Sequence, residues 1–273
     1  MGGTGKTPLL IRLANDLKSA GRHPAILSRG YGEDELTLMK EKCAGVPLGA
    51  GANRFASSVE LLKTNPVDVF LLDDGFQHWA LRRDMDIVCI DAAARFETEF
   101  LLPIGRLREP WSSLGRANVA VITRAHLATG QRRIELKRRV QELIPGGTVL
   151  VSEFERTLVE SRTGNILPWE EIRGKKVVAV SAIGNPAAFE GDLIQQGAIV
   201  VPLRFRDHRV YGERDVARIK GASERNAAPL VTTEKDWVKL KQFGLDMRIV
   251  RVDVRFAEDD ESRWKSLVRG MVR

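Results

Sequence analysis

The feature that most constrains the fold is the glycine-rich start of the chain, GGTGKT at residues 2–7. Glycines adopt backbone conformations that other residues avoid, so successive N–H groups can point at one anion. A lysine and a threonine after such glycines can serve nucleotide phosphates and Mg²⁺ at the start of a helix. The pattern predicts a phosphate-binding loop rather than a simple glycine-rich turn. Its predicted members are Gly2, Gly3, Thr4, Gly5, Lys6 and Thr7.

The residues behind this loop have the alternation of an α/β fold. Leu9, Leu13 and Leu17, together with Leu10, follow helical spacing on one face. Short β-rich runs (PAIL, VDVFLLDDG, MDIVCIDA, ANVAVITRA and TVLVSEF) alternate with helical stretches, which predicts a mostly parallel sheet of P-loop NTPase type. A polar stretch over roughly 155–175 interrupts the alternation, which then restarts. We therefore expect a P-loop core domain over 1–170 and a smaller α/β domain over 171–273.

Composition narrows the class of partner. The formal net charge of +7 suits an anionic partner such as a nucleic acid, a phosphorylated substrate or an anionic membrane surface. The sequence has neither the aromatic and basic interleaving of an RNA-binding sheet nor a helix-turn-helix pattern, so we expect no nucleic acid. No apolar run reaches the length of a membrane span. Cys43 and Cys89 lack the spacing of metal ligands.

Asp73 and Asp74 end the apolar run VDVFLLDDG. Alone, such a pair is compatible with a simple strand-to-turn transition. In a chain that also has a phosphate loop, the pair indicates a metal-side position, because P-loop proteins hold a magnesium-side acid at the carboxyl end of a neighbouring strand. We therefore expect both aspartates at the metal side of a nucleotide.

Longer motifs follow one another along the chain, in the order GGTGKTP, LSRGYG, DDGFQH, LLPIGRLREP, IGNPAAF, FRDHRVY and TTEKDWVKL. Together they closely resemble the tetraacyldisaccharide 4′-kinases of lipid A biosynthesis, over essentially the whole chain. The resemblance implies a P-loop kinase that uses ATP and Mg²⁺. Its implied acceptor is an acylated glucosamine disaccharide 1-phosphate lipid, at the anionic cytoplasmic face of the bacterial inner membrane.

The resemblance also implies roles for single residues. GEDEL resembles the Gly-Asp-Glu-Pro stretch of the family, which makes Asp34 the catalytic carboxylate and His208 its partner. In such a dyad the carboxylate accepts the hydroxyl proton and the imidazole orients it. The two residues fall in different predicted domains, so we expect domain closure to assemble them. The implied substrate contacts are Tyr31, Glu35, Arg54 and Arg108. The implied metal-side groups are Thr7, Asp73, Asp74 and Glu109.

Some residues depart from the family pattern or leave alternatives open. Leu36 and Arg106 stand where proline is usual, and Glu234, Lys235 and Asp236 fit either the site or a charged turn.

Family members carry a strand and a membrane-anchoring helix before the loop, so the resemblance predicts that the protein begins upstream of Met1. The rival readings are a deviant-Walker ATPase of the partition or metal-carrier type and an inactive truncated remnant. The first rival needs a lysine where Met1 stands.

Overall fold

A computed structural model describes residues 4–30, 32–93, 100–105 and 107–271. The chain divides into two compact units. The first unit comprises residues 1–30, 43–155 and 253–273, and the second comprises 31–42 and 156–252. These units interleave along the chain, unlike the consecutive domains 1–170 and 171–273 expected from the sequence. The domain division itself stays a prediction.

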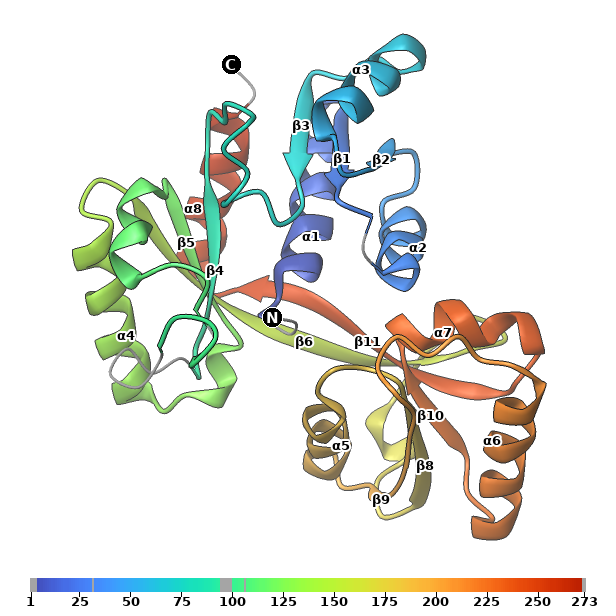
Figure 1. The fold of residues 1–273 in the computed structure, drawn as a ribbon. Helices are drawn as coiled ribbons and strands as arrows, with labels where there is room; N and C mark the ends of the chain where they lie inside the picture. The colour runs from blue at the N-terminus through green and yellow to red at the C-terminus, as the bar shows by residue number, and fades with distance from the viewer. Residues whose placement is uncertain (1–3, 31, 94–99, 106, 272–273) are drawn as a thin grey trace. The chain divides into compact units, whose positions relative to one another are not determined.

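The helices and strands alternate along the chain (Figure 1). Those of the first unit are α1 (Lys6–Ser19), β1 (Pro24–Ser28), β2 (Leu48–Ala50), α3 (Arg54–Thr64), β3 (Val69–Leu72), β4 (Ile87–Asp91), η1 (Trp111–Arg116), β5 (Val119–Thr123), η2 (Ala125–Leu127), α4 (Gly130–Leu143) and α8 (Glu258–Gly270). Those of the second unit are α2 (Glu33–Lys42), β7 (Ile166–Leu167), η3 (Trp169–Glu171), β8 (Lys176–Ser181), α5 (Pro186–Gln195), β9 (Ile199–Arg204), α6 (Glu213–Asn226), β10 (Leu230–Thr233), α7 (Glu234–Leu240) and η4 (Lys241–Phe243). Strands β6 (Thr148–Glu160) and β11 (Met247–Phe256) have residues in both units.

The pairs β1–β2, β1–β3, β4–β5, β5–β6, β8–β9, β8–β10 and β10–β11 are parallel, and the short strand β7 is antiparallel to β6. In the first unit the strand orders are β2-β1-β3 and β4-β5-β6, with pairs such as Ala25↔Phe70 and Cys89↔Val121. In the second unit the order is β11-β10-β8-β9. The predicted mostly parallel α/β architecture is therefore confirmed.

Both faces of the second unit's sheet are buried, as expected of parallel strands that carry helices on each side. Successive side chains of β8 point to opposite faces. Val178 and Val180 pack with Ile219 of α6, whereas Val177 packs with Leu193 of α5. Figure 1 shows α5 and α6 on the two sides of this sheet.

The C-terminal helix α8 belongs to the first unit, because it packs on α1. Trp264 is fully buried, stacks on Phe256 and donates its indole N–H to Asp16 of α1 at 2.7 Å. Leu9, Leu13 and Leu17 of α1 are buried as the helical spacing predicts, and Leu10 is partly exposed. Within the described ranges, no helix combines the length and apolarity that crossing a bilayer requires.

Candidate active site

The described part of the predicted phosphate loop has the backbone geometry that its glycines suggest. Gly5 precedes α1 with a φ of 86°, a left-handed conformation that favours glycine. A Cβ at Gly5 would lie 2.7 Å from Cζ of Phe154 on β6. Thr123, at the end of β5, donates its hydroxyl to the Thr4 carbonyl at 2.7 Å. Strand β5 therefore holds the loop at the N-terminus of α1, and the N-terminus of a helix favours negative charge. Gly2 and Gly3 lie outside the described residues, as does Tyr31.

Asp74 brings together the cations expected at the phosphates. Its Oδ1 lies 3.4 Å from Lys6 Nζ, and its Oδ2 accepts a hydrogen bond of 2.5 Å from Arg108 Nη1. Burial by itself raises the pKa of Asp74, but the Arg108 hydrogen bond and the Lys6 charge outweigh it and lower the pKa below its usual value. The backbone of Asp74 is left-handed, with a φ of 51°. Non-glycine residues rarely adopt this conformation, and such strain often accompanies functional sites.

Arg54 braces the turn that carries the two aspartates. Its side chain is buried at 4% exposure, and Nη2 donates to the carbonyl oxygen of Asp73 at 2.6 Å. The carbonyl oxygen of Asp74 lies 3.5 Å from the same nitrogen. The Ser28 hydroxyl at the end of β1 lies 3.4 Å from Asp73 Oδ2. Arg54 thus has a positioning role in the turn, and its predicted contact with substrate stays a prediction.

Glu109 pairs with a cation, and its predicted place beside a metal ion stays a prediction. Its Oε2 accepts from Arg116 Nη2 at 2.8 Å, and the Arg116 guanidinium lies 4.5 Å above the rings of both Phe76 and Trp79. Within the described ranges, no group of three or more His, Cys, Asp or Glu side chains forms a metal cluster. The oxygen donors of Thr7, Asp73 and Asp74 nevertheless have the chemistry that Mg²⁺ prefers, and Mg²⁺ normally needs only one or two carboxylates beside phosphate oxygens.

Asp34 and His208 contact each other within the second unit. His208 Nδ1 lies 3.1 Å from Asp34 Oδ1, which also accepts from the Glu35 N–H at 3.0 Å. The Asp34 side chain is 3% exposed and the His208 side chain 49%. A Cβ at Gly32 would lie 3.0 Å from Asp34 Oδ1 and 3.3 Å from His208 Cε1, so only glycine fits there comfortably.

Both members of this pair lie in one compact unit, and the expected closure between the predicted domains stays a prediction. Helix α2, which begins at Glu33, belongs to the same compact unit as the loop of His208. The sequence suggested otherwise because α2 lies far from His208 along the chain.

Lysines of α7 surround the Asp34 carboxylate. Lys239 Nζ lies 3.3 Å from Asp34 Oδ2, and Lys235 Nζ lies 3.7 Å from the same oxygen and 2.9 Å from Glu35 Oε1. Burial alone raises the pKa of Asp34, but the charges of Lys235, Lys239 and His208 outweigh it and lower the pKa. Sequence reasoning missed Lys239. The available signal was the i,i+4 spacing of the two lysines in TTEKDWVKL, which places them on one helix face.

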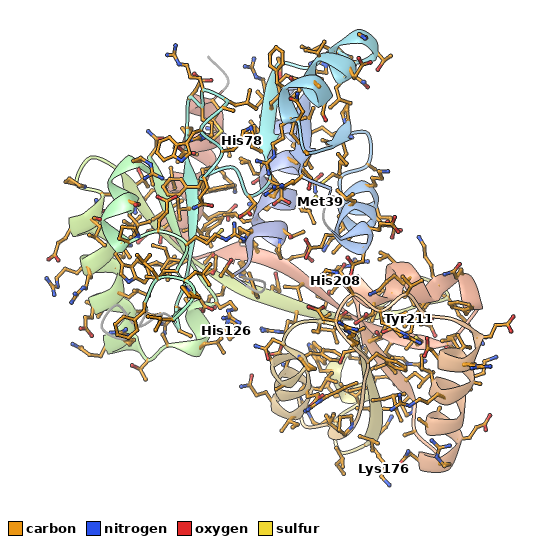
Figure 2. All side chains as sticks on the ribbon, in the orientation of Figure 1. Met39, His78, His126, Lys176, His208 and Tyr211 are labelled. Carbon is orange, nitrogen blue, oxygen red and sulfur yellow. The ribbon has the colours of Figure 1, made fainter. Side chains whose placement is uncertain are left out.

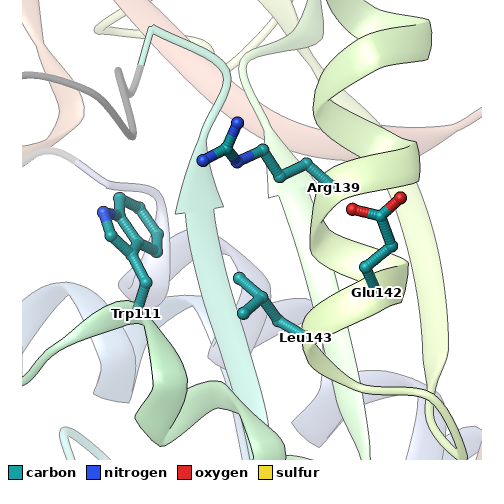
Figure 3. A pocket seen from close by; sticks show the side chains of 4 residues that line it. All are labelled: Trp111, Arg139, Glu142 and Leu143. Atoms are coloured by element: carbon teal, nitrogen blue, oxygen red, sulfur yellow. The ribbon is translucent and has the colours of Figure 1, made fainter.

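A pocket in the first unit has a lining that includes none of these residues. Trp111 of η1 and Arg139, Glu142 and Leu143 of α4 line it (Figure 3). Trp111 and Leu143 also pack against the core of that unit. None of the predicted site residues lines this pocket, so we assign it no part in the chemistry.

Comparison with known proteins tests the family. The family model described as "Tetraacyldisaccharide-1-P 4'-kinase" matches residues 1–273. The chain belongs to this family. Among the relatives, the tetraacyldisaccharide 4′-kinase of Halothermothrix orenii is 36% identical, with 88% of this chain and 72% of that protein covered. The tetraacyldisaccharide 4′-kinase of Anaeromyxobacter sp. is 33% identical, with 100% of this chain and 81% of that protein covered.

A solved structure of the family agrees with the fold. A crystal structure of LpxK from Aquifex aeolicus, described as an apo form in complex with ATP, matches with a TM-score of 0.73 at 25% identity. The match covers 99% of this chain and 85% of that chain. The tetraacyldisaccharide 4′-kinase family thus accounts for both the motifs and the architecture.

Proposed function

We propose that this protein transfers the γ-phosphate of ATP to the 4′-hydroxyl of a tetraacyldisaccharide 1-phosphate, an acylated glucosamine disaccharide of lipid A biosynthesis. The observation that carries this proposal is the family match over residues 1–273. That range includes the phosphate loop and both members of the Asp34–His208 pair.

The first unit supplies the groups for ATP. The N-terminus of α1 and Lys6 offer N–H donors and a positive charge to the phosphates. Arg108 and Lys6 are both held by Asp74, so two cations are already gathered beside the loop. Thr7, Asp73 and Asp74 would hold Mg²⁺, which neutralises charge on the phosphate oxygens when bound.

The second unit supplies the groups for the acceptor hydroxyl. Both Asp34 oxygens already have partners and the carboxylate is buried, whereas about half of the His208 side chain is exposed. We therefore place the hydroxyl beside His208 Nε2, which accepts its proton while Nδ1–H donates to Asp34 Oδ1. A protonated ring then lies between Asp34 and Asp207, whose Oδ1 is 3.9 Å from Nε2. This assignment exchanges the roles expected from the sequence, where Asp34 accepts the proton.

The net charge of +7 supports peripheral association with an anionic bilayer, and we place the reaction at the cytoplasmic face of the bacterial inner membrane. Glu35 is paired with Lys235, and its predicted contact with the substrate remains part of the proposal.

The test separates the kinase from the rival ATPase. The protein is incubated with ATP and Mg²⁺, with and without tetraacyldisaccharide 1-phosphate in detergent micelles. The proposal expects ADP to form in step with a lipid bearing a second phosphate, located at the 4′ position by NMR. ADP formation at equal rates without the lipid, and no phosphorylated lipid, would refute it in favour of the ATPase.

A further inference from the structure

Ion pairs connect α2 to the segment of α7 and η4 within the second unit. The pairs, written from α2 to its partner, are Asp34–Lys239, Glu35–Lys235, Glu41–Lys241 and Lys42–Glu234. Most exposed pairs of this kind contribute little to stability. Two of the pairs are largely buried: the side chains of Asp34 and Lys239 are 3% and 16% exposed, and those of Lys42 and Glu234 are 17% and 15% exposed.

Lys239 is itself held by a buried anchor. Its Nζ lies 3.2 Å from Oδ1 of Asp236, whose side chain is fully buried. Asp236 Oδ1 accepts from the Tyr211 hydroxyl, and its Oδ2 accepts from the Ala182 N–H, each at 3.0 Å. Burial, followed by the nearby Asp236 charge, raises the pKa of Tyr211 far above its usual value, so the hydroxyl stays a donor. Asp236 is therefore fixed, and it fixes Lys239.

The same anchor reaches His208 by a second route. Ala182 follows β8, and its carbonyl oxygen accepts from the His208 N–H at 3.2 Å. His208 and Tyr211 lie on one connection between β9 and α6 (Figure 2). One residue at the end of β8 thus contacts both the backbone of His208 and the anchor of Lys239. Through these contacts Asp34 and His208 are positioned from a common point.

We propose that Lys239, anchored by Asp236, is a positioning residue that holds the Asp34 carboxylate against His208 for phosphoryl transfer. Only the role in phosphoryl transfer rests on the proposed function; the contact of Lys239 with Asp34 does not. The placement of catalytic groups matters at this scale, because a displacement of about 1 Å can cost on the order of 100-fold in rate. A lysine pinned between two buried carboxylates restricts Asp34 more than a free lysine would.

The charges around Asp34 give the inference a second readout. His208 faces it from the β9–α6 connection, Lys235 and Lys239 face it from α7, and Glu35 is its neighbour on α2. Tyr211 and Asp236 stand behind Lys239, and Asp207 lies on the far side of the imidazole. Removing the Lys239 charge takes away one of the groups that lower the Asp34 pKa, so that pKa must rise.

The experiment compares three variants with the wild type. Lys239→Met removes the charge, Lys239→Arg keeps it, and Lys241→Met removes the exposed pair with Glu41, which lies away from Asp34. We expect Lys239→Met to lower kcat by about 10- to 100-fold with little change in the KM for ATP. In the kcat–pH profile of Lys239→Met, the fall in kcat on the acid side moves to higher pH. Lys239→Arg retains most activity and the wild-type profile, and Lys241→Met matches the wild type.

A carbon-13 NMR titration of the Asp34 carboxyl in wild type and Lys239→Met gives a readout independent of activity. A wild-type protein without transfer activity would refute the proposed function. The titration would still test the contact of Lys239 with Asp34, because it does not depend on activity. An unchanged Asp34 pKa in the variant overturns the inference, as does an equal loss of kcat in Lys239→Met and Lys241→Met. If the methionine variant fails to fold, Lys239→Gln, which removes the charge and keeps an N–H donor on a side chain one bond shorter, is judged by the same criteria.

Discussion

Replacing Gly5 by alanine tests whether the observed conformation of the phosphate loop is the one that binds ATP. Alanine at a φ of 86° costs about 1–2 kcal/mol relative to a right-handed conformation. The added Cβ would lie 2.7 Å from Phe154 Cζ and 3.3 Å from Thr123 Cβ, so the ring must shift. Overpacking of this kind costs about 1–3 kcal/mol. The total cost of Gly5→Ala is then roughly 2–5 kcal/mol.

The cost falls either on folding or on binding. If the loop keeps its conformation without nucleotide, the free energy of unfolding drops by this amount. If the loop relaxes instead, the cost is met on binding, and the Kd for ATP rises by roughly 30- to 4000-fold. Urea unfolding and calorimetric titration with Mg²⁺-ATP measure the two parts, whose sum should reach about 2–5 kcal/mol.

A second substitution separates the contributions. Phe154→Leu shortens the side chain that the new Cβ would meet, so Gly5→Ala combined with Phe154→Leu should recover the steric part and keep the backbone part. Phe154→Leu alone is the control for the lost ring contacts. A Gly5→Ala protein with wild-type stability and an ATP affinity within twofold of wild type would refute the reasoning.

Three further predictions follow from the two units. Lys6→Met should reduce phosphate transfer by on the order of 100- to 1000-fold while the circular dichroism spectrum is retained; transfer near the wild-type rate would contradict it. Arg54→Met should lower the free energy of unfolding in urea by about 1–3 kcal/mol, because the Asp73 carbonyl loses its buried donor. An unchanged midpoint of urea unfolding would contradict the view that Arg54 stabilises this turn. The folded-state pKa of Asp34 is lowered, so its contribution to stability is present above the unfolded value of 3.8 and is lost as the pH falls through the folded value. Asp34→Asn should therefore lose less stability than the wild type between about pH 5 and pH 2, and parallel acid profiles of the two proteins would contradict this.

The sequence was most informative where chemistry depends on neighbours in the chain. The loop around Gly5, the acids that end β3 and the parallel strands all follow from local patterns of glycine, charge and apolar residues. Strand β3 could be predicted from an apolar run that is followed by Asp73 and Asp74.

Which helices join which unit could not be predicted from the sequence in the same way. Helix α2 joins the second unit through ion pairs with residues about 200 positions away, such as Glu35–Lys235. Helix α8 joins the first unit because Trp264 is buried against α1. No local pattern specifies these partners, since exposed lysines and acids occur on most helices. The i,i+4 spacing places Lys235 and Lys239 on one face of α7, but the role of Lys239 depends on the buried Asp236 and on α2, which the spacing does not specify.

The most direct test of the central claim is transfer of the γ-phosphate from labelled ATP to tetraacyldisaccharide 1-phosphate in micelles, with ATP binding measured in parallel. The wild type and Asp34→Asn are compared under both assays. We expect the wild type to phosphorylate the lipid, and we expect Asp34→Asn to bind ATP normally and to lose most of the transfer. Transfer by Asp34→Asn at the wild-type rate, or ATP binding by the wild type with no phosphorylated lipid, would contradict it.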